Sequence, residues 1–149
     1  MSVLEINELT KRVIGAAIAV HTALGPGLLE SVYRDCLVIE LTGLGLEVKV
    51  EERVPIVYRG QRVRGDLRID LLVDARVIVE IKVVERLHPV YQAQLITYLK
   101  LTGCPAGLLM NFNATTLEAG LKRVDHPDLY QQKRAIRINP KSTDNTSGN

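Results

Sequence analysis

The chain has 149 residues, of which 46% are hydrophobic and 24% are charged, and this composition excludes a disordered, fibrous or multidomain protein. Its net charge of +2 neither requires nor excludes a polyanionic partner. The sequence contains no run of 18 apolar residues and no signal-peptide pattern, so we expect a cytoplasmic protein that does not contact a membrane. We predict one domain at residues 1–138, followed by a disordered tail at 139–149 that has nothing to bury.

Two helices are predicted at the start of the chain. Apolar residues recur at mostly helical steps over residues 4–24, which predicts an amphipathic helix that ends at Gly25-Pro26-Gly27. A second helix is predicted from about residue 28 to residue 41, because glycines follow it at 43 and 45. The chain therefore begins with a helical pair.

The period of the apolar pattern changes to two after these helices. Extended structure is indicated between residues 48 and 57 and is closed by the turn at 59–61. Residues 67–73 and 77–83 carry apolar side chains at every odd position, on either side of Asp74-Ala75-Arg76. This pattern predicts a hairpin whose buried face is formed by the odd positions.

The rest of the chain alternates between helix and strand. His88-Pro89 begins a predicted helix that runs to about residue 102, and residues 106–112 are typical of a buried strand. A short helix with a threonine cap is predicted over residues 115–124. The order of elements predicts an α/β fold with a mixed central sheet flanked by helices.

The predicted hairpin brings four charged residues together. With Asp74-Ala75-Arg76 as the loop, Asp70 lies opposite Glu80 and Arg68 lies opposite Lys82, with Cβ atoms about 5 Å apart. Two adjacent carboxylates repel each other unless one is protonated or a cation lies between them. Mg²⁺ suits such a pair, because it is usually held by one or two carboxylates and several waters. Lys82 would then direct its ammonium at a phosphate or at a water bound to the metal.

A second interpretation of these charges stays open. Four charges that neutralise one another are also typical of a solvated strand face, and an isolated E-x-K usually indicates that. However, Leu72, Ile78 and Val84 flank the charges on the even face, which indicates that helices cover it. A partly covered cluster of charges is more often a functional site.

The sequence also resembles a known family. Gly27-Leu28-Leu29-Glu30-Ser31-Val32-Tyr33 fits the G-x-x-E-x-x-Y signature of a family of small bacterial proteins that is assigned to the PD-(D/E)xK nuclease superfamily. The resemblance covers about residues 5–124. It continues through Tyr58-Arg59-Gly60, Arg68-Ile69-Asp70, Val79-Glu80-Ile81-Lys82 and Gln94-Leu95-Ile96-Thr97-Tyr98-Leu99. It implies a restriction-endonuclease-like αβββαβ core with an extra N-terminal helix.

The resemblance also implies a chemistry. This chemistry is hydrolysis of phosphodiester bonds in nucleic acid, with DNA favoured, and it depends on Mg²⁺ or Mn²⁺. Asp70 and Glu80 would be metal ligands, and Glu30 would reach the metal from its helix, directly or through water. Lys82 would orient or activate the attacking water. The superfamily's proline before the first aspartate is Ile69 here, which leaves the ligand in place.

Two further helical pairs have a functional and a structural interpretation. Gln94 and Tyr98 resemble the Q-x-x-x-Y element of some nucleases, and their spacing of four places them on one helix face that would line a cleft. Tyr33 is three residues from Glu30. Its structural interpretation is a hydrogen bond to Glu30 that fixes the start of the helix, whereas the resemblance favours a role of this pair in the site.

Three functions are compatible with these observations. The first is a metal-dependent nuclease, in which a single site would pair in a homodimer or act twice to break both strands of a duplex. The second is a nucleic-acid-binding or protein-interaction module on an inactive nuclease scaffold, which the small net charge favours. The third is a structural α/β protein. Because Asp70, Glu80 and Lys82 are all present, we favour the nuclease.

Overall fold

The computed structural model describes residues 2–129 of the chain, so the predicted tail at 139–149 and the end of the predicted domain lie outside the described residues. The elements in chain order are α1 (Val3–Leu24), α2 (Glu30–Gly43), β1 (Val48–Tyr58), β2 (Gln61–Val73), β3 (Val77–Lys82), α3 (Pro89–Thr102), β4 (Ala106–Asn111), the 3₁₀ helix η1 (Glu118–Gly120) and β5 (Leu121–Asp125).

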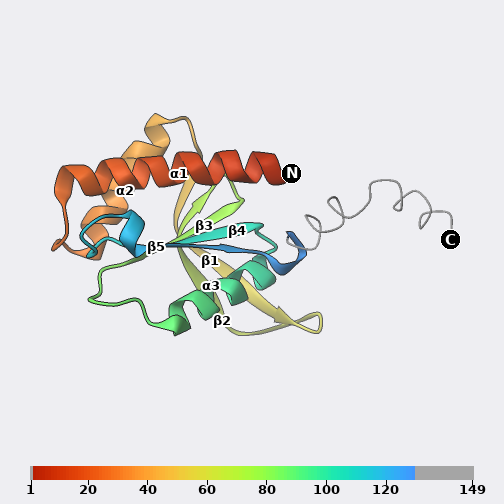
Figure 1. Cartoon of the computed structure of the whole chain (residues 1–149). Helices are drawn as coiled ribbons and strands as arrows, with labels where there is room; N and C mark the ends of the chain where they lie inside the picture. Colours follow the sequence, from red (N-terminus) through yellow and green to blue (C-terminus); the bar gives the residue numbers. More distant parts are fainter. Residues whose placement is uncertain (1, 130–149) are drawn as a thin grey trace.

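The five strands form one mixed sheet in the order β1-β2-β3-β4-β5. Only β3 and β4 are parallel, and α3 makes the crossover between them. Figure 1 shows α1 and α2 over one face of the sheet and α3 over the other. The predicted α/β fold, with its αβββαβ order and its extra N-terminal helix, is confirmed, and β5 is added at the edge.

Each face of the sheet has its own apolar core. The larger core lies under α1 and α2 and includes Val13, Leu37 and Leu71, whereas the smaller one lies under α3 and includes Leu95 and Leu99. Under α3 the packing is close. A Cβ on Gly107 in β4 would lie 2.8 Å from the side chain of Leu95, so only glycine allows this approach of helix to strand.

The helix boundaries follow local signals. Ser2 caps α1 by accepting a hydrogen bond from the N–H of Glu5, and Gly25 ends the helix with a φ of 69°. His88 caps α3 in the same way through Nδ1, and Gly103 ends it in the left-handed region. The second helix begins at Glu30, two residues later than predicted. Within residues 2–129, none of the helices combines the length and apolar character that a membrane crossing requires.

The helix predicted over residues 115–124 is wrong. This segment forms η1 and then β5, which pairs with β4 in antiparallel fashion. The threonine signal is real, since Thr116 accepts a hydrogen bond from the N–H of Ala119, but it caps only one turn. At Gly120 a Cβ would lie 2.4 Å from the carbonyl oxygen of Asn111, so the absent side chain lets the chain fold back onto β4.

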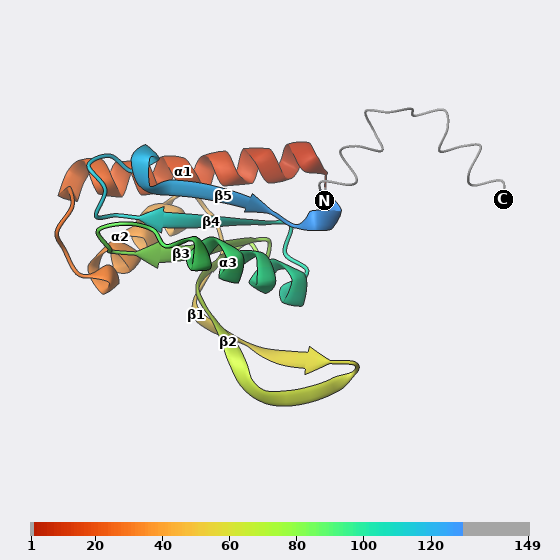
Figure 2. The same ribbon diagram turned by 60° about the horizontal axis from the view of Figure 1, so that its bottom comes forward.

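The register predicted for the β2–β3 hairpin is confirmed at its loop end, where Val73 pairs with Val77 and Leu71 with Val79. The prediction that all odd positions share one face is wrong at Ile69, which packs in the core under α3. The cause is a kink beside it. Glu51 of β1 stands at the level of Asp70 and has a φ of 51°, which is rare for a residue with a side chain. Beyond this level the β1–β2 ribbon turns away from the sheet (Figure 2).

Candidate active site

Asp70 and Glu80 lie where β2 and β3 stop pairing. The ladder ends at Leu71 and Val79, and beyond it the two side chains take over the hydrogen bonds. The N–H of Ile81 donates to Asp70 Oδ2 at 2.9 Å, and the N–H of Asp70 donates to Glu80 Oε1 at 3.3 Å. The carboxylates are therefore neighbours, as the register predicts, but each is turned toward the backbone of the opposite strand.

Burial makes this pair electrostatically unusual. Asp70 is 4% exposed and Glu80 is 8% exposed. Burial and the nearby charge of Asp70 raise the pKa of Glu80 to about 8, against the opposing effects of the Asp70 N–H and of Lys82. At neutral pH, and without a cation, Glu80 therefore carries a proton and the repulsion within the pair is relieved.

Glu30 is the first residue of α2 and is half-buried. Its pKa is raised by burial and then by the charge of Asp70, and it is lowered by Lys82. These influences mean that Glu30 lies within electrostatic reach of both Asp70 and Lys82. The start of α2 thus brings a third carboxyl group toward the pair.

Tyr33 explains how α2 is held in this position. Its hydroxyl donates to the carbonyl of Gly25 at 2.6 Å and accepts from the N–H of Leu28 at 3.1 Å, and its ring stacks on Phe112. The expected hydrogen bond to Glu30 is therefore wrong, because the hydroxyl reaches back to the loop instead. The expected effect remains, since this contact fixes the chain just before Glu30.

Lys82 ends β3, and its Nζ lies 4.5 Å from the centre of the Tyr91 ring. This is within the range of a cation–π contact, which holds the ammonium at one place on the surface of α3. Tyr91 was not identified from the sequence. The sequence contains a pattern that could have identified it, because residues 91, 94 and 98 have the spacing of three and four that places side chains on one face of a helix.

Gln94 and Tyr98 occupy that face of α3. Gln94 Nε2 donates to the hydroxyl of Tyr98 at 3.3 Å. The pKa of Tyr98 is raised by burial and by the negative charges of Glu80 and Asp70, so its hydroxyl lies within electrostatic reach of the carboxyl pair. α3 therefore presents three polar side chains toward the end of the β2–β3 ladder.

Arg68 does not face Lys82 as predicted. The ladder has ended before it, and Arg68 Nη2 binds Glu51 Oε1 at 2.7 Å, while its Nη1 lies 3.9 Å from Asp70 Oδ1. The same oxygen of Glu51 binds Arg34 of α2 at 2.7 Å. Glu51 and Arg34 were both missed. The only sequence signal was the interruption of the alternating pattern at Glu51, because their contact joins elements far apart in the chain.

Asn111 and His21 have structural roles. Asn111 lies beside Lys82 in the β3–β4 ladder, and its side chain donates to the carbonyl of Val84 and accepts from the N–H of Val84. His21 Nε2 lies 3.2 and 2.9 Å from the carbonyl oxygens of Phe112 and Ala114. These contacts secure the segments after β3 and β4.

The side chains of the candidate site can be compared with the coordination that a metal ion requires. Among residues 2–129, no three or more Asp, Glu, His and Cys side chains are arranged as a metal cluster. Mg²⁺ does not require one, because it is commonly held by one or two carboxylates, waters and substrate phosphates. Asp70 and Glu80 supply four hard oxygen atoms, of which Oδ2 and Oε1 accept hydrogen bonds from backbone N–H groups, while Asp70 Oδ1 lies 3.9 Å from Arg68 Nη1. The buried pair therefore fits a hard divalent cation by its chemistry.

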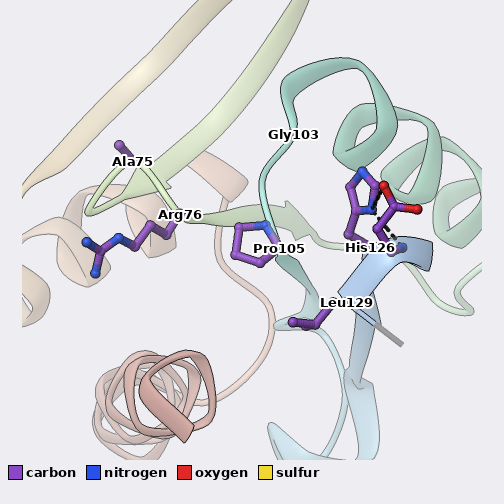
Figure 3. A pocket seen from close by; sticks show the side chains of 7 residues that line it. Ala75, Arg76, Gly103, Pro105, His126 and Leu129 are labelled. Atoms are coloured by element: carbon purple, nitrogen blue, oxygen red, sulfur yellow. Dashed lines mark hydrogen bonds and ion pairs between the residues drawn. The ribbon is translucent and has the colours of Figure 1, made fainter. Parts of the chain in front are cut away.

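A cavity of about 430 Å³ lies elsewhere, next to Arg76, Pro105 and His126 (Figure 3). Arg76 precedes β3, and Glu80 lies four residues farther along the strand, so about 13 Å of strand separates this cavity from the carboxyl pair. Among the described residues, no pair of carboxylates lines this cavity.

Comparisons with known proteins agree with this geometry. A family model described as PD-(D/E)XK nuclease superfamily matches residues 7–124. The solved structure titled "Crystal structure of SSO0001" is similar with a TM-score of 0.51 and 17% sequence identity, over 92% of this chain and 71% of that chain. At this identity the similarity concerns the fold alone. No curated protein matches the sequence.

Proposed function

Because the chain belongs to the PD-(D/E)XK nuclease superfamily, we propose that it hydrolyses phosphodiester bonds of DNA with the help of a divalent metal ion. The observation that supports this function is the buried Asp70–Glu80 pair where β2 and β3 separate, with Lys82 beside it. The finer assignment to the family named for G-x-x-E-x-x-Y rests on Gly27, Glu30 and Tyr33 and belongs to the same proposal.

Asp70 and Glu80 would hold Mg²⁺ or Mn²⁺ through their carboxylate oxygens, and Glu30 would reach it directly or through water. The bound ion would polarise the scissile phosphate and lower the pKa of water. Glu80 must lose its proton to serve as a ligand, so binding releases a proton at neutral pH. The raised pKa of Glu80 thus makes metal affinity increase with pH up to about 8.

Lys82 would act on the phosphate and on the attacking water. Its ammonium, held against Tyr91, is a fixed positive charge that stabilises the negative charge developing in the transition state. Tyr98 and Gln94 form a hydrogen-bonded pair near the carboxylates and would position the substrate backbone or a water. Tyr91 is a positioning residue, since it acts through Lys82.

A second candidate function is supported by one specific observation. The carboxylates of Asp70 and Glu80 accept hydrogen bonds from the backbone, so the pair has a structural role even without metal. An inactive module that binds nucleic acid or protein would retain both residues for this reason. Activity on purified nucleic acid separates the two functions.

The test uses the full chain with duplex DNA, single-stranded DNA and RNA, each in Mg²⁺, Mn²⁺ or EDTA. We expect cleavage of DNA with either metal, none in EDTA, and none by the Glu80→Gln variant. Asp128→Asn is the matched control, because Asp128 is 77% exposed and lies beside the distant cavity. Cleavage that survives EDTA or Glu80→Gln, or a folded wild type that cuts nothing, contradicts the nuclease.

A homodimer would place two such sites on one duplex. We expect the stoichiometry of the complex with duplex DNA, measured by sedimentation, to be two chains per duplex. One chain per duplex with both strands cut would mean that a single site acts twice.

A further inference from the structure

The β1–β2 ribbon continues beyond the kink as an exposed arm, which we define as residues 53–68. The two strands stay paired from Arg53 and Arg68 to the turn at Arg59-Gly60. Figure 2 shows the arm projecting from the body of the protein. Within it only Leu67 is buried, so packing of an apolar core does not account for its length.

The arm is strongly basic. Its 16 residues contain five arginines and one aspartate, a net charge of +4 in a chain whose total is +2. The arginines are Arg53, Arg59, Arg62, Arg64 and Arg68, and all are exposed. The positive charge of the protein is therefore concentrated on the arm, while the rest of the chain is slightly negative.

These charges are incompletely neutralised. Arg62 binds Asp66 at 2.9 Å, and Arg68 binds Glu51. Among residues 2–129 no ion pair involves Arg53, Arg59 or Arg64. The register also places Arg53 directly opposite Arg68, and such like-charged pairs are destabilising unless an anion lies near them.

The arm leads to the carboxyl pair. Arg68 is its last residue and lies 3.9 Å from Asp70 through Nη1 and Oδ1. Arg62 pairs with Val57, and Asp70 stands at the level of Glu51, six residues earlier in β1, so the ribbon spans about 20 Å between them at about 3.3 Å per residue. This length matches about six steps along one DNA strand, at about 3.4 Å per step. A polyanion lying along the arm would therefore arrive at the candidate active site.

We propose that the arm enters the major groove of duplex DNA and holds the duplex with one backbone at the Asp70–Glu80 pair. The proposal rests on the proposed function. The major groove of B-form DNA is about 12 Å wide and admits a two-stranded ribbon, whereas the major groove of A-form RNA is narrow and deep. Single strands are bound on platforms of several aromatic rings, whereas the arm has one aromatic ring, Tyr58, with the Arg59 guanidinium 5.5 Å from its centre. Duplex DNA is therefore the partner.

The test measures binding of a fluorescent 20-base-pair DNA by the full chain in EDTA over a series of salt concentrations. The arm variant is Arg53→Gln, Arg59→Gln and Arg64→Gln together. Each lost phosphate contact should lower the slope of log K against log salt by about 0.9, so we expect a decrease of up to about 2.7. We also expect at least a tenfold loss of affinity.

The matched control removes the same charge elsewhere. Lys11, Lys100 and Lys122 are exposed on α1, α3 and β5, and their replacement by glutamine should change the affinity much less. Thermal unfolding checks that each variant is folded. If the triple arm variant does not fold, its three single substitutions are measured, and each should lower the slope by about 0.9.

Equal affinity and slope in the arm variant and the control overturn the proposal. So does equally tight binding of duplex RNA or single-stranded DNA that depends on the arm in the same way. The outcome is distinct from that of the cleavage test. Arm-dependent binding without cleavage supports the arm and refutes the nuclease, whereas cleavage with arm-independent binding refutes the arm alone.

Discussion

The two ends of the β2–β3 hairpin are held together by different interactions. At the loop end, Leu71 and Val79 belong to a regular ladder in which the backbone groups of the two strands bind each other and the side chains fill the core. At the open end, Asp70 and Glu80 satisfy the backbone with their carboxylates. The same two strands are thus stabilised by apolar burial at one end and carry buried charge at the other.

The difference shows how the protein keeps a costly pair of carboxylates in place. A buried charge is tolerated only where it is hydrogen-bonded or paired, and here the hydrogen bonds come from the strands themselves. The regular end fixes the register, and the register fixes the position of the carboxylates. The open end can therefore retain two carboxyl groups that repel each other once Glu80 loses its proton, a repulsion that a cation would relieve.

The largest effect that we expect concerns pH. The pKa of Glu80 is raised from 4.5 to about 8, so the folded state holds a proton that the unfolded state releases. This stabilisation is fully present below about pH 4.5 and is lost as the pH rises through about 8. At about 1.36 kcal/mol per unit of pKa, the full loss is on the order of 5 kcal/mol. Urea unfolding of the metal-free protein between pH 5 and pH 9 measures it.

Glu80→Gln is the control for this profile, because it removes the titrating group and keeps the hydrogen-bonding shape. We expect its stability to be nearly independent of pH over the same range. An unchanged pH profile in Glu80→Gln would show that another group carries the dependence and that the open end is not electrostatically strained.

The loop end should respond to volume instead. Leu71 is fully buried, so Leu71→Ala should lower the free energy of unfolding by about 2 to 5 kcal/mol, through the lost contacts and the cavity. The pH profile should keep its shape, because the carboxyl pair is intact. Leu4→Ala, at a position that is 80% exposed, should change the stability by less than about 0.5 kcal/mol. A profile that changes shape in Leu71→Ala would mean that the two ends are not independent.

Asp70→Asn should distinguish a metal site from mutual neutralisation. For a metal site, the variant should be more stable than the metal-free wild type at a pH above about 8, where Glu80 has lost its proton and the two carboxylates of the wild type repel each other. It should also lose the stabilisation by Mg²⁺ or Mn²⁺, about 2.7 kcal/mol at a concentration of 100 times Kd. Thermal unfolding with and without metal measures both effects.

Mutual neutralisation of the charges predicts a different behaviour of Asp70→Asn. If Asp70 only balances Arg68 and Lys82, Asp70→Asn should lower the stability modestly and leave the response to metal unchanged. Asp128→Asn should match the wild type under either interpretation.

The loop end of the hairpin was predictable because its signals are local. The odd-position pattern and Asp74-Ala75-Arg76 determine which residues pair, and Gly103 and His88-Pro89 likewise determine where α3 ends and begins. By contrast, β5 could not be recognised from its own residues. Its strand conformation depends on the open edge of β4 and on Gly120 lying against Asn111, contacts that a local pattern does not contain.

The open end was predictable only in part. The register placed Asp70 and Glu80 side by side with Lys82 on the same face, and the resemblance added Glu30, Gln94 and Tyr98. The exchange of hydrogen bonds between carboxylate and backbone was not foreseen. It depends on the strands separating after Leu71, which goes with the kink at Glu51 and the twist of the ribbon. The contact of Lys82 with Tyr91 was missed because it joins a strand to a helix.

That contact gives the smallest effect that we expect. The Tyr91 ring holds the Lys82 ammonium at 4.5 Å, and a cation–π contact of this kind is worth about 0.5 to 2 kcal/mol. Tyr91→Leu should therefore lower kcat for DNA cleavage by roughly threefold to thirtyfold. KM should change little, because the Lys82 ammonium stabilises negative charge that develops only in the chemical step. Tyr91→Phe keeps the ring and should retain nearly full activity, while Lys82→Ala sets the limit of the loss. The metal-induced rise in Tm should be the same in all three variants, because an ammonium is not a metal ligand. Equal kcat values for Tyr91→Leu and Tyr91→Phe would show that the ring does not position Lys82.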